Sequence, residues 1–246
     1  MGANASTAVP TYASGQVLDA ARLNLTNSGV PVFSGTATRD AAFGGSGEKT
    51  LAEGQLCYLE DSNAVQFYNG AAFGAVSGLT FITEATVTSS TSANFDNVFS
   101  ATYDNYRVII SDITSSGGEV GVAYRMRVGG VSNTATEYDH QEFRVYSTGS
   151  TANGGENGAT AGYLWACATS PANHAGGCII DFMQPFLAKP TTLLVTSHVF
   201  NNAVSAYMYN TIGNTHTVSS SFDGFTIFQT TTTTAYKIKI YGYANS

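Results

Sequence analysis

From residue 79 onward the chain consists of short β-prone runs separated by clusters of Gly, Asn, Ser and Thr. The runs recur at intervals of roughly ten residues, which is typical of sandwiches and barrels, and no amphipathic helical pattern interrupts them. This pattern predicts an all-β protein whose largest part is a jelly-roll-like β-sandwich. The expected strands are 80–88, 106–113, 120–128, 141–146, 163–168, 178–183, 193–200, 205–209, 217–221, 225–229 and 235–243, with polar loops at 148–160 and 170–177.

One strand near the start of this region is especially clear. Asp104 and Asn105 favour a turn, because their side chains bond their own backbone, and segment 106–113 after them is rich in β-branched and aromatic residues. The continuous apolar run at 108–110 predicts that this strand is buried on both faces. The last expected strand, 235–243, alternates lysine with isoleucine, which predicts one exposed and one buried face.

The N-terminal part of the chain divides into two segments. Residues 31–78 hold a predicted hairpin, in which strand 55–59 pairs with strand 65–68 across an Asp-Ser-Asn turn. An isolated hairpin is marginally stable in water, so this module should need a further surface to cover one of its faces. Residues 1–30 hold few aliphatic side chains and are expected to form an extended arm with a short helix at 17–25, or to be simply disordered. The expected order is therefore an arm at 1–30, a small β-hairpin module at 31–78 and the β-sandwich at 79–246.

The chain carries few charges. Only 11% of its 246 residues are charged, against about 25% in ordinary soluble domains. Its net charge of −7 and its 10 unclustered basic residues argue against nucleic-acid binding. The sequence does not open with a basic and apolar leader, and no apolar run approaches the ~18 residues of a membrane span. We therefore expect a protein made in a cytoplasm, with no secretory signal and no membrane insertion.

Residues with chemical reactivity are scattered along the chain. The histidines and cysteines have no metal-binding spacing, so neither a metal nor a cofactor is expected. Asp139 and His140 with a nearby serine have the residue types of a catalytic triad, but no nucleophile-elbow motif accompanies them. Asp139, Glu142 and Asp181 could supply a glycosidase carboxylate pair, although the sequence fixes no distance between them. We expect no enzymatic activity.

Several aromatic residues lie beside Asn, Asp and Gly in expected loops. Such side chains can stack on a sugar ring and bond its hydroxyl groups. The competing interpretation is that they are ordinary sheet residues whose polar ends reach the rim of the fold. The candidate glycan-binding residues are Tyr138, Asp139, Tyr163, Trp165, Asn173 and His174.

Short motifs at both ends of the chain carry a family resemblance. An Ala-x-Tyr-Asp-Asn-Tyr-Arg segment at 101–107 leads into an aliphatic strand, and a Lys-Ile-Lys-Ile-Tyr-Gly run lies at 237–242. Further motifs lie at 16–24, 39–43, 53–61 and 68–73. Together they resemble the surface proteins of tailed-bacteriophage virions, of the tail-fibre, head-fibre or capsid-decoration type. Those proteins have an N-terminal anchoring segment and a C-terminal β-sandwich, and they commonly carry Trp where this chain has Phe73.

The resemblance implies a structural role as a short fibre or capsid decoration protein, exposed on the virion surface. Its motifs are turns and strands without chemistry, so head, neck and tail locations all stay open. A receptor- or glycan-binding adhesin tip of a tail fibre is the alternative. The implied partners are capsid, neck or tail proteins and, for the adhesin, a host-surface glycan. The expected anchor residues in the arm are Val17, Leu18, Leu23 and Leu25.

The hairpin module also predicts self-association. Identical subunits usually cover such exposed faces through closed rotational symmetry, and the low charge density means that few ions would lose their water on association. The resemblance, and not the spacing, selects three copies over two, so we expect a homotrimer. The residues expected near the threefold axis are Leu56, Tyr58, Leu59, Phe67, Tyr68 and Phe73.

Overall fold

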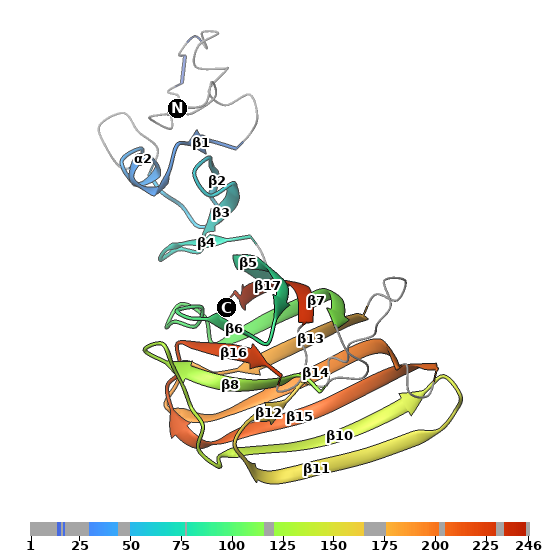
Figure 1. Cartoon of the computed structure of the whole chain (residues 1–246). Coiled ribbons are helices and arrows are strands. Elements are labelled where there is room, and N and C mark those ends of the chain that lie inside the picture. Colours follow the sequence, from blue (N-terminus) through green and yellow to red (C-terminus); the bar gives the residue numbers. More distant parts are fainter. Residues whose placement is uncertain are drawn as a thin grey trace. The chain divides into compact units, whose positions relative to one another are not determined.

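The computed structural model describes residues 14–15, 17, 30–43, 50–76, 78–115, 121–164, 176–201, 205–229 and 234–244. Most of these residues lie in strands, and the one helix among them is the five-residue α2 (Thr36–Asp40). The chain divides into two compact units, Met1–Gly78 and Leu79–Ser246, both built from the strands drawn as arrows in Figure 1. The predicted all-β sandwich fold is confirmed.

The N-terminal unit has one four-stranded sheet, in the order β1 (Val32–Phe33), β2 (Leu56–Leu59), β3 (Ala64–Tyr68) and β4 (Phe73–Ala75). The predicted hairpin forms its centre, since β2 and β3 pair antiparallel with Leu56 opposite Phe67 and Tyr58 opposite Val65. Asn63 in the connecting turn has a φ of 49°, a left-handed conformation that Asn tolerates. The hairpin is thus extended by a strand on each side.

A small core covers one face of this sheet. Phe33, Ala42, Cys57 and Leu59 are buried together, and Phe73 packs against them. Side chains alternate along a strand, so Cys57 and Leu59 point toward this core while their neighbours on β2 point away from it. The module therefore covers one of its two faces with its own residues.

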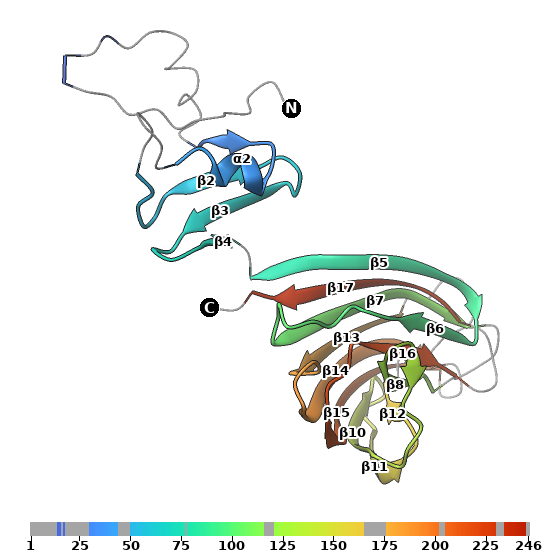
Figure 2. The same cartoon turned by 90° about the vertical axis from the view of Figure 1, so that its left-hand side faces the viewer.

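The C-terminal unit has two sheets of unequal size. The larger sheet contains, in spatial order, β11 (Thr151–Ala159), β10 (Tyr138–Tyr146), β15 (Ala206–Ser220), β14 (Lys189–Asn201), β13 (Gly176–Met183), β7 (Asn105–Ser115), β17 (Thr234–Tyr243) and β5 (Leu79–Ser90). The smaller sheet contains β12 (Gly162–Tyr163), β8 (Ala123–Val128), β16 (Gly224–Phe228) and β6 (Ser92–Phe95), with β9 (Val131–Ser132) paired to β8. Figure 2 shows the larger sheet as a curved array with the smaller sheet on its inner side. The sandwich therefore has a wide, curved layer and a narrow one.

The core between the two sheets is built around aromatic side chains. Phe182 on β13 packs against Phe225 on β16, with ring centroids 5.0 Å apart, and against Tyr124 on β8 at 6.2 Å. Phe99, in the segment after β6, packs against both phenylalanines at 5.1 and 5.6 Å. All four side chains are 2% exposed or less. Aromatic packing thus joins the two layers.

Two expectations about strand positions are wrong. Segment 148–160 was expected to be a loop but contains β11, whose Gly and Asn residues pair with β10 at the edge of the larger sheet. Segments 205–209 and 217–221 were expected to be separate strands but belong to one strand, β15. In both places the pairing with neighbouring strands overrides a weak local β-propensity.

The burial of two central strands can also be compared with the sequence. On β17, Lys237 and Lys239 are exposed while the isoleucines between and beyond them are buried, as the alternation predicts. On β7, Val108 and Ile110 are buried but Ile109 is only half-buried, so burial on both faces was wrong. The reason is that only one face of the larger sheet is covered by the smaller one. We call the opposite face of the larger sheet the outer face.

Candidate binding surfaces

The predicted glycan-binding residues do not form one surface. Tyr138 is fully buried, and its hydroxyl accepts a hydrogen bond from the Met126 N–H and donates one to the Asn133 carbonyl, each at 3.0 Å. It cannot stack on a sugar, so this prediction is wrong. Residue 138 is the first residue of strand β10 and not part of a loop, and its side chain faces the core. Trp165, Asn173 and His174 lie outside the described residues.

The two remaining candidates, Asp139 and Tyr163, act within the fold. The Asp139 carboxylate accepts a hydrogen bond from the Gly158 N–H at 2.8 Å and so ties β10 to β11. The Tyr163 ring stacks on His140 with centroids 5.2 Å apart. Because Asp139 and His140 are consecutive on a strand, their side chains point to opposite faces of the sheet. The structure therefore brings together neither this pair of glycan candidates nor an Asp139–His140 dyad.

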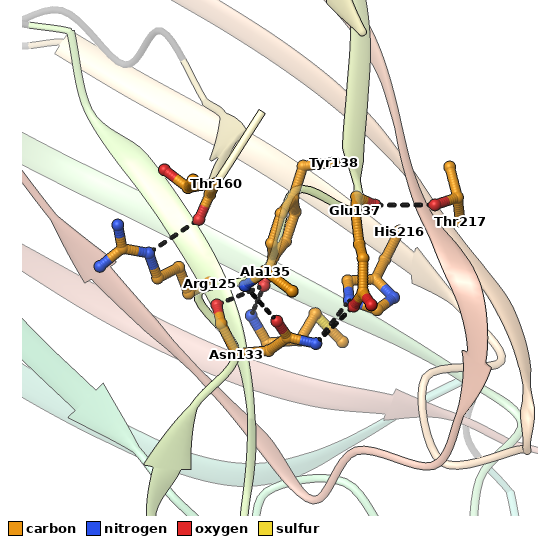
Figure 3. A network of polar contacts seen from close by, with 9 residues as sticks. Arg125, Asn133, Ala135, Glu137, Tyr138, Thr160, His216 and Thr217 are labelled. Carbon is orange, nitrogen blue, oxygen red and sulfur yellow. Dashed lines mark hydrogen bonds and ion pairs between the residues drawn. The ribbon is translucent and has the colours of Figure 1, made fainter. Parts of the chain in front are cut away.

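A buried polar network surrounds Tyr138 (Figure 3). The Asn133 side-chain amide donates to the Glu137 carboxylate at 2.8 Å and lies 3.1 Å from His216 Nε2. His216 is fully buried, and burial lowers its pKa below the ordinary imidazole value, an effect that the nearby Glu137 carboxylate only partly opposes. A neutral imidazole can accept the bond from Asn133. The network thus holds the ends of β10 and β15 to the segment after β9.

His216 should make the stability of the sandwich depend on pH. Its pKa is lower in the fold than in the unfolded chain, so the unfolded state binds more protons as the pH falls below about 6.5. The free energy of unfolding should have its full value above that pH and should decrease as the pH falls toward the folded-state pKa. We expect denaturant midpoints measured between pH 7.5 and pH 5 to fall more steeply for the wild type than for His216→Gln. Parallel curves for the two proteins would contradict this assignment.

The carboxylates considered for glycoside hydrolysis are each engaged by donors of the chain itself. Asp181 accepts two bonds of 2.7 Å from the Arg107 guanidinium and one of 2.8 Å from the Tyr243 hydroxyl. Burial alone would raise the pKa of Asp181, but these hydrogen bonds outweigh it and hold the pKa below its ordinary value. Glu142 is paired with the arginine two residues further along β10. Asp181 and Glu142 therefore belong to structural ion pairs.

The uncovered side of the N-terminal sheet is apolar. Leu56, Val65 and Phe67 are 40%, 42% and 38% exposed, and Tyr58 is half-buried beside them. The register places Leu56 opposite Phe67 and Tyr58 opposite Val65, so these side chains form two adjacent cross-strand pairs. We call these four residues the module face.

Three of the predicted interface residues lie on the other side of this sheet. Leu59 is 1% exposed within the small core of its own chain, so its prediction as an interface residue is wrong. Tyr68 packs on Phe73 with ring centroids 5.3 Å apart, and the Arg39 guanidinium lies 4.3 Å from the Phe73 ring centroid. The alternation of strand side chains explains the error, because neighbours on one hairpin cannot all share one face. Of the predicted anchor residues, Val17 is 84% exposed, and Leu18, Leu23 and Leu25 lie outside the described residues.

A second surface, which the sequence interpretation missed, lies on the outer face of the larger sheet. His198 on β14 is the register partner of Tyr209 on β15, and its ring stacks parallel to that of Tyr207, with centroids 5.4 Å apart and 5° between planes. Phe200 meets Tyr207 edge to face at 5.2 Å. Only the pairing of β14 with β15 brings these rings together. The available signal was the recurrence of ring-bearing residues at every second position, with His198 and Phe200 on β14 and Tyr207 and Tyr209 on β15.

Within the described residues, no helix is long and apolar enough to cross a membrane. The same part of the chain holds no group of three or more His, Cys, Asp or Glu side chains arranged for a metal ion. A scan against protein-family models gives no match to this chain, and a search of curated proteins gives none either.

Proposed function

We propose that this chain is a non-catalytic structural subunit of a tailed-phage virion. In this role its N-terminal region attaches to the particle, and its β-sandwich is exposed as a short fibre or capsid decoration. The observation that carries the proposal is the module face, an apolar surface on a unit separate from the sandwich. Contiguous exposed apolar surface rimmed by polar residues marks an interaction site. The motif resemblance at both ends of the chain supports a virion as the setting.

We further propose that copies of the chain cover the module face by forming a homotrimer. Its two cross-strand pairs place four apolar side chains side by side, and none of the four carries a charge that association would desolvate. A closed rotational arrangement brings the same residues of every copy together. The choice of three copies rests on the resemblance to phage appendage proteins, which are commonly trimeric.

Attachment can be tested by removing residues 1–30. Particles produced in cells that express the full chain should carry it at a fixed copy number, measured by quantitative mass spectrometry. The shortened chain should be absent from purified particles although it is soluble and retains the circular dichroism spectrum and unfolding midpoint of the full chain. Normal incorporation of the shortened chain would contradict the assignment of the anchor to this segment.

A further inference from the structure

We propose that the outer face of the larger sheet binds an uncharged saccharide, in a groove over Gly177 beside His198 and Tyr209. This site is distinct from the residues predicted by sequence and does not depend on the virion role proposed above. A virion decoration protein and an adhesin could both carry it.

The groove originates in an interruption of the sheet. The pairing of β7 with β13 passes from Ile113–Gly176 to Ile110–Cys178, so two residues of β7, Ser111 and Asp112, oppose the single Gly177 of β13. This is a β-bulge, and Asp112 within it has a φ of 54°, in the left-handed region. Bulges are over-represented next to functional sites, where they redirect side chains.

Missing side-chain volume at the bulge leaves a hollow. Glycines at 176 and 177 contribute no side chain, and the resulting groove has a volume of about 490 Å³. That volume lies within the roughly 300–1,000 Å³ of small-molecule sites. The side chains that border it on the outer face are Ile109, Ser111, Asp112, Ile179, Thr196 and His198.

The aromatic cluster beside the groove supplies a stacking surface. His198 borders the groove, and its ring is stacked on Tyr207, while its register partner Tyr209 is 45% exposed. A saccharide presents C–H groups on the faces of its ring and hydroxyl groups around the edge. Exposed aromatic rings suit the first and the hydroxyls of Ser111 and Thr196 suit the second. The combination of stacking surface and hydroxyls selects a saccharide over a purely apolar ligand.

The charges around the groove are paired, which favours an uncharged ligand. Among the described residues, Asp112 is the one carboxylate that borders it, and its oxygen lies 2.8 Å from the Lys237 ammonium. On the same face, Asp181 is held in a two-bond ion pair by Arg107. An anionic sugar would have to compete with these carboxylates for the lysine and arginine side chains. The net charge of −7 would also repel it.

A protein partner fits this face less well. Threonines at 196 and 211 are register partners on β14 and β15 and separate Ile179 from the exposed Phe143. The apolar side chains are therefore interspersed with hydroxyls and do not form the continuous apolar centre of a protein interface.

The test is binding of the purified full chain to an array of neutral mono- and oligosaccharides built from glucose, galactose, mannose, rhamnose and N-acetylhexosamines. Any saccharide bound is then titrated by saturation-transfer NMR. Gly177→Leu should fill the groove without forcing the backbone, because a Cβ at this position would lie 3.6 Å from the Ile110 carbonyl oxygen, an ordinary contact. We expect this variant and Tyr209→Ala each to weaken binding by about tenfold or more.

Phe143→Ala is the matched control, since this exposed ring lies on the same face but on β10, where its register partner is Thr211, whereas Tyr209 is the register partner of the groove residue His198. It should change binding by less than about twofold. All variants should keep the wild-type unfolding midpoint, which separates loss of the site from loss of the fold. Binding to no neutral saccharide, binding only to anionic glycans, or equal loss in Phe143→Ala and Gly177→Leu would overturn the proposal.

Discussion

Ile110→Asp should abolish soluble expression of the chain. Ile110 is 3% exposed on β7, between its register partners Cys178 on β13 and Ile238 on β17, and it faces the core of the sandwich. A carboxylate there would have no partner, and its burial should cost about 5 kcal/mol or more. That is comparable with the whole stability of a typical domain, about 5–15 kcal/mol. The measurement is the soluble fraction after expression, followed by denaturant unfolding of any soluble protein.

The neighbouring residue provides the control. Ile109 is half-buried on the outer face, where its register partners are Ile179 and Lys239. Ile109→Asp introduces the same charge one position away on the same strand, and it should remain soluble with a smaller loss of stability. Soluble, cooperatively folded Ile110→Asp would contradict the position of β7 between the two layers.

Replacing Tyr58 and Phe67 together by aspartate should convert the proposed trimer into monomers that keep a folded sandwich. Both side chains belong to the module face, and their replacement would place several like charges within one interface. The small core of the module, which includes Leu59, lies on the other face of the sheet and should tolerate the change. Light scattering at micromolar concentration measures the mass, and circular dichroism reports the β-structure that remains.

The control for this prediction is a double variant of two exposed valines on the sandwich. Val128 and Val131 are register partners on β8 and β9 and are 54% and 68% exposed. Val128→Asp with Val131→Asp adds the same two charges at a hairpin outside the module face, so the mass should stay that of the wild type. Loss of association in both double variants would show that charge alone, and not the module face, controls it.

The fold could be predicted where the local sequence pattern matches the burial of the side chains in the structure. The alternation of lysine and isoleucine on β17 has the period of a strand covered on one face, and the structure has that pattern. The hairpin of β2 and β3 could be predicted because its two strands are adjacent in the sequence. By contrast, β11 has the sequence Thr-Ala-Asn-Gly-Gly-Glu-Asn-Gly-Ala, whose strand conformation depends on pairing with β10 and not on propensity.

The candidate sites were harder to predict, because a surface depends on the exact register between paired strands. Tyr138 looked like a loop residue, but β10 begins at that position and directs its ring into the core. His198 and Tyr209 lie on consecutive strands, but they are register partners only in the register that β14 and β15 adopt. The bulge at Gly177 likewise needs both β7 and β13 to be placed. A one-residue change of register would move any of these side chains to the opposite face.

The most direct test of the proposed role is the copy number of the full chain on purified phage particles, determined by quantitative mass spectrometry and by cryo-electron microscopy of the same preparation. We expect a fixed number of copies per particle, grouped in threes at symmetry-related positions, with density for the β-sandwich on the particle surface. Absence of the chain from particles, or a copy number that varies with its expression level, would contradict it.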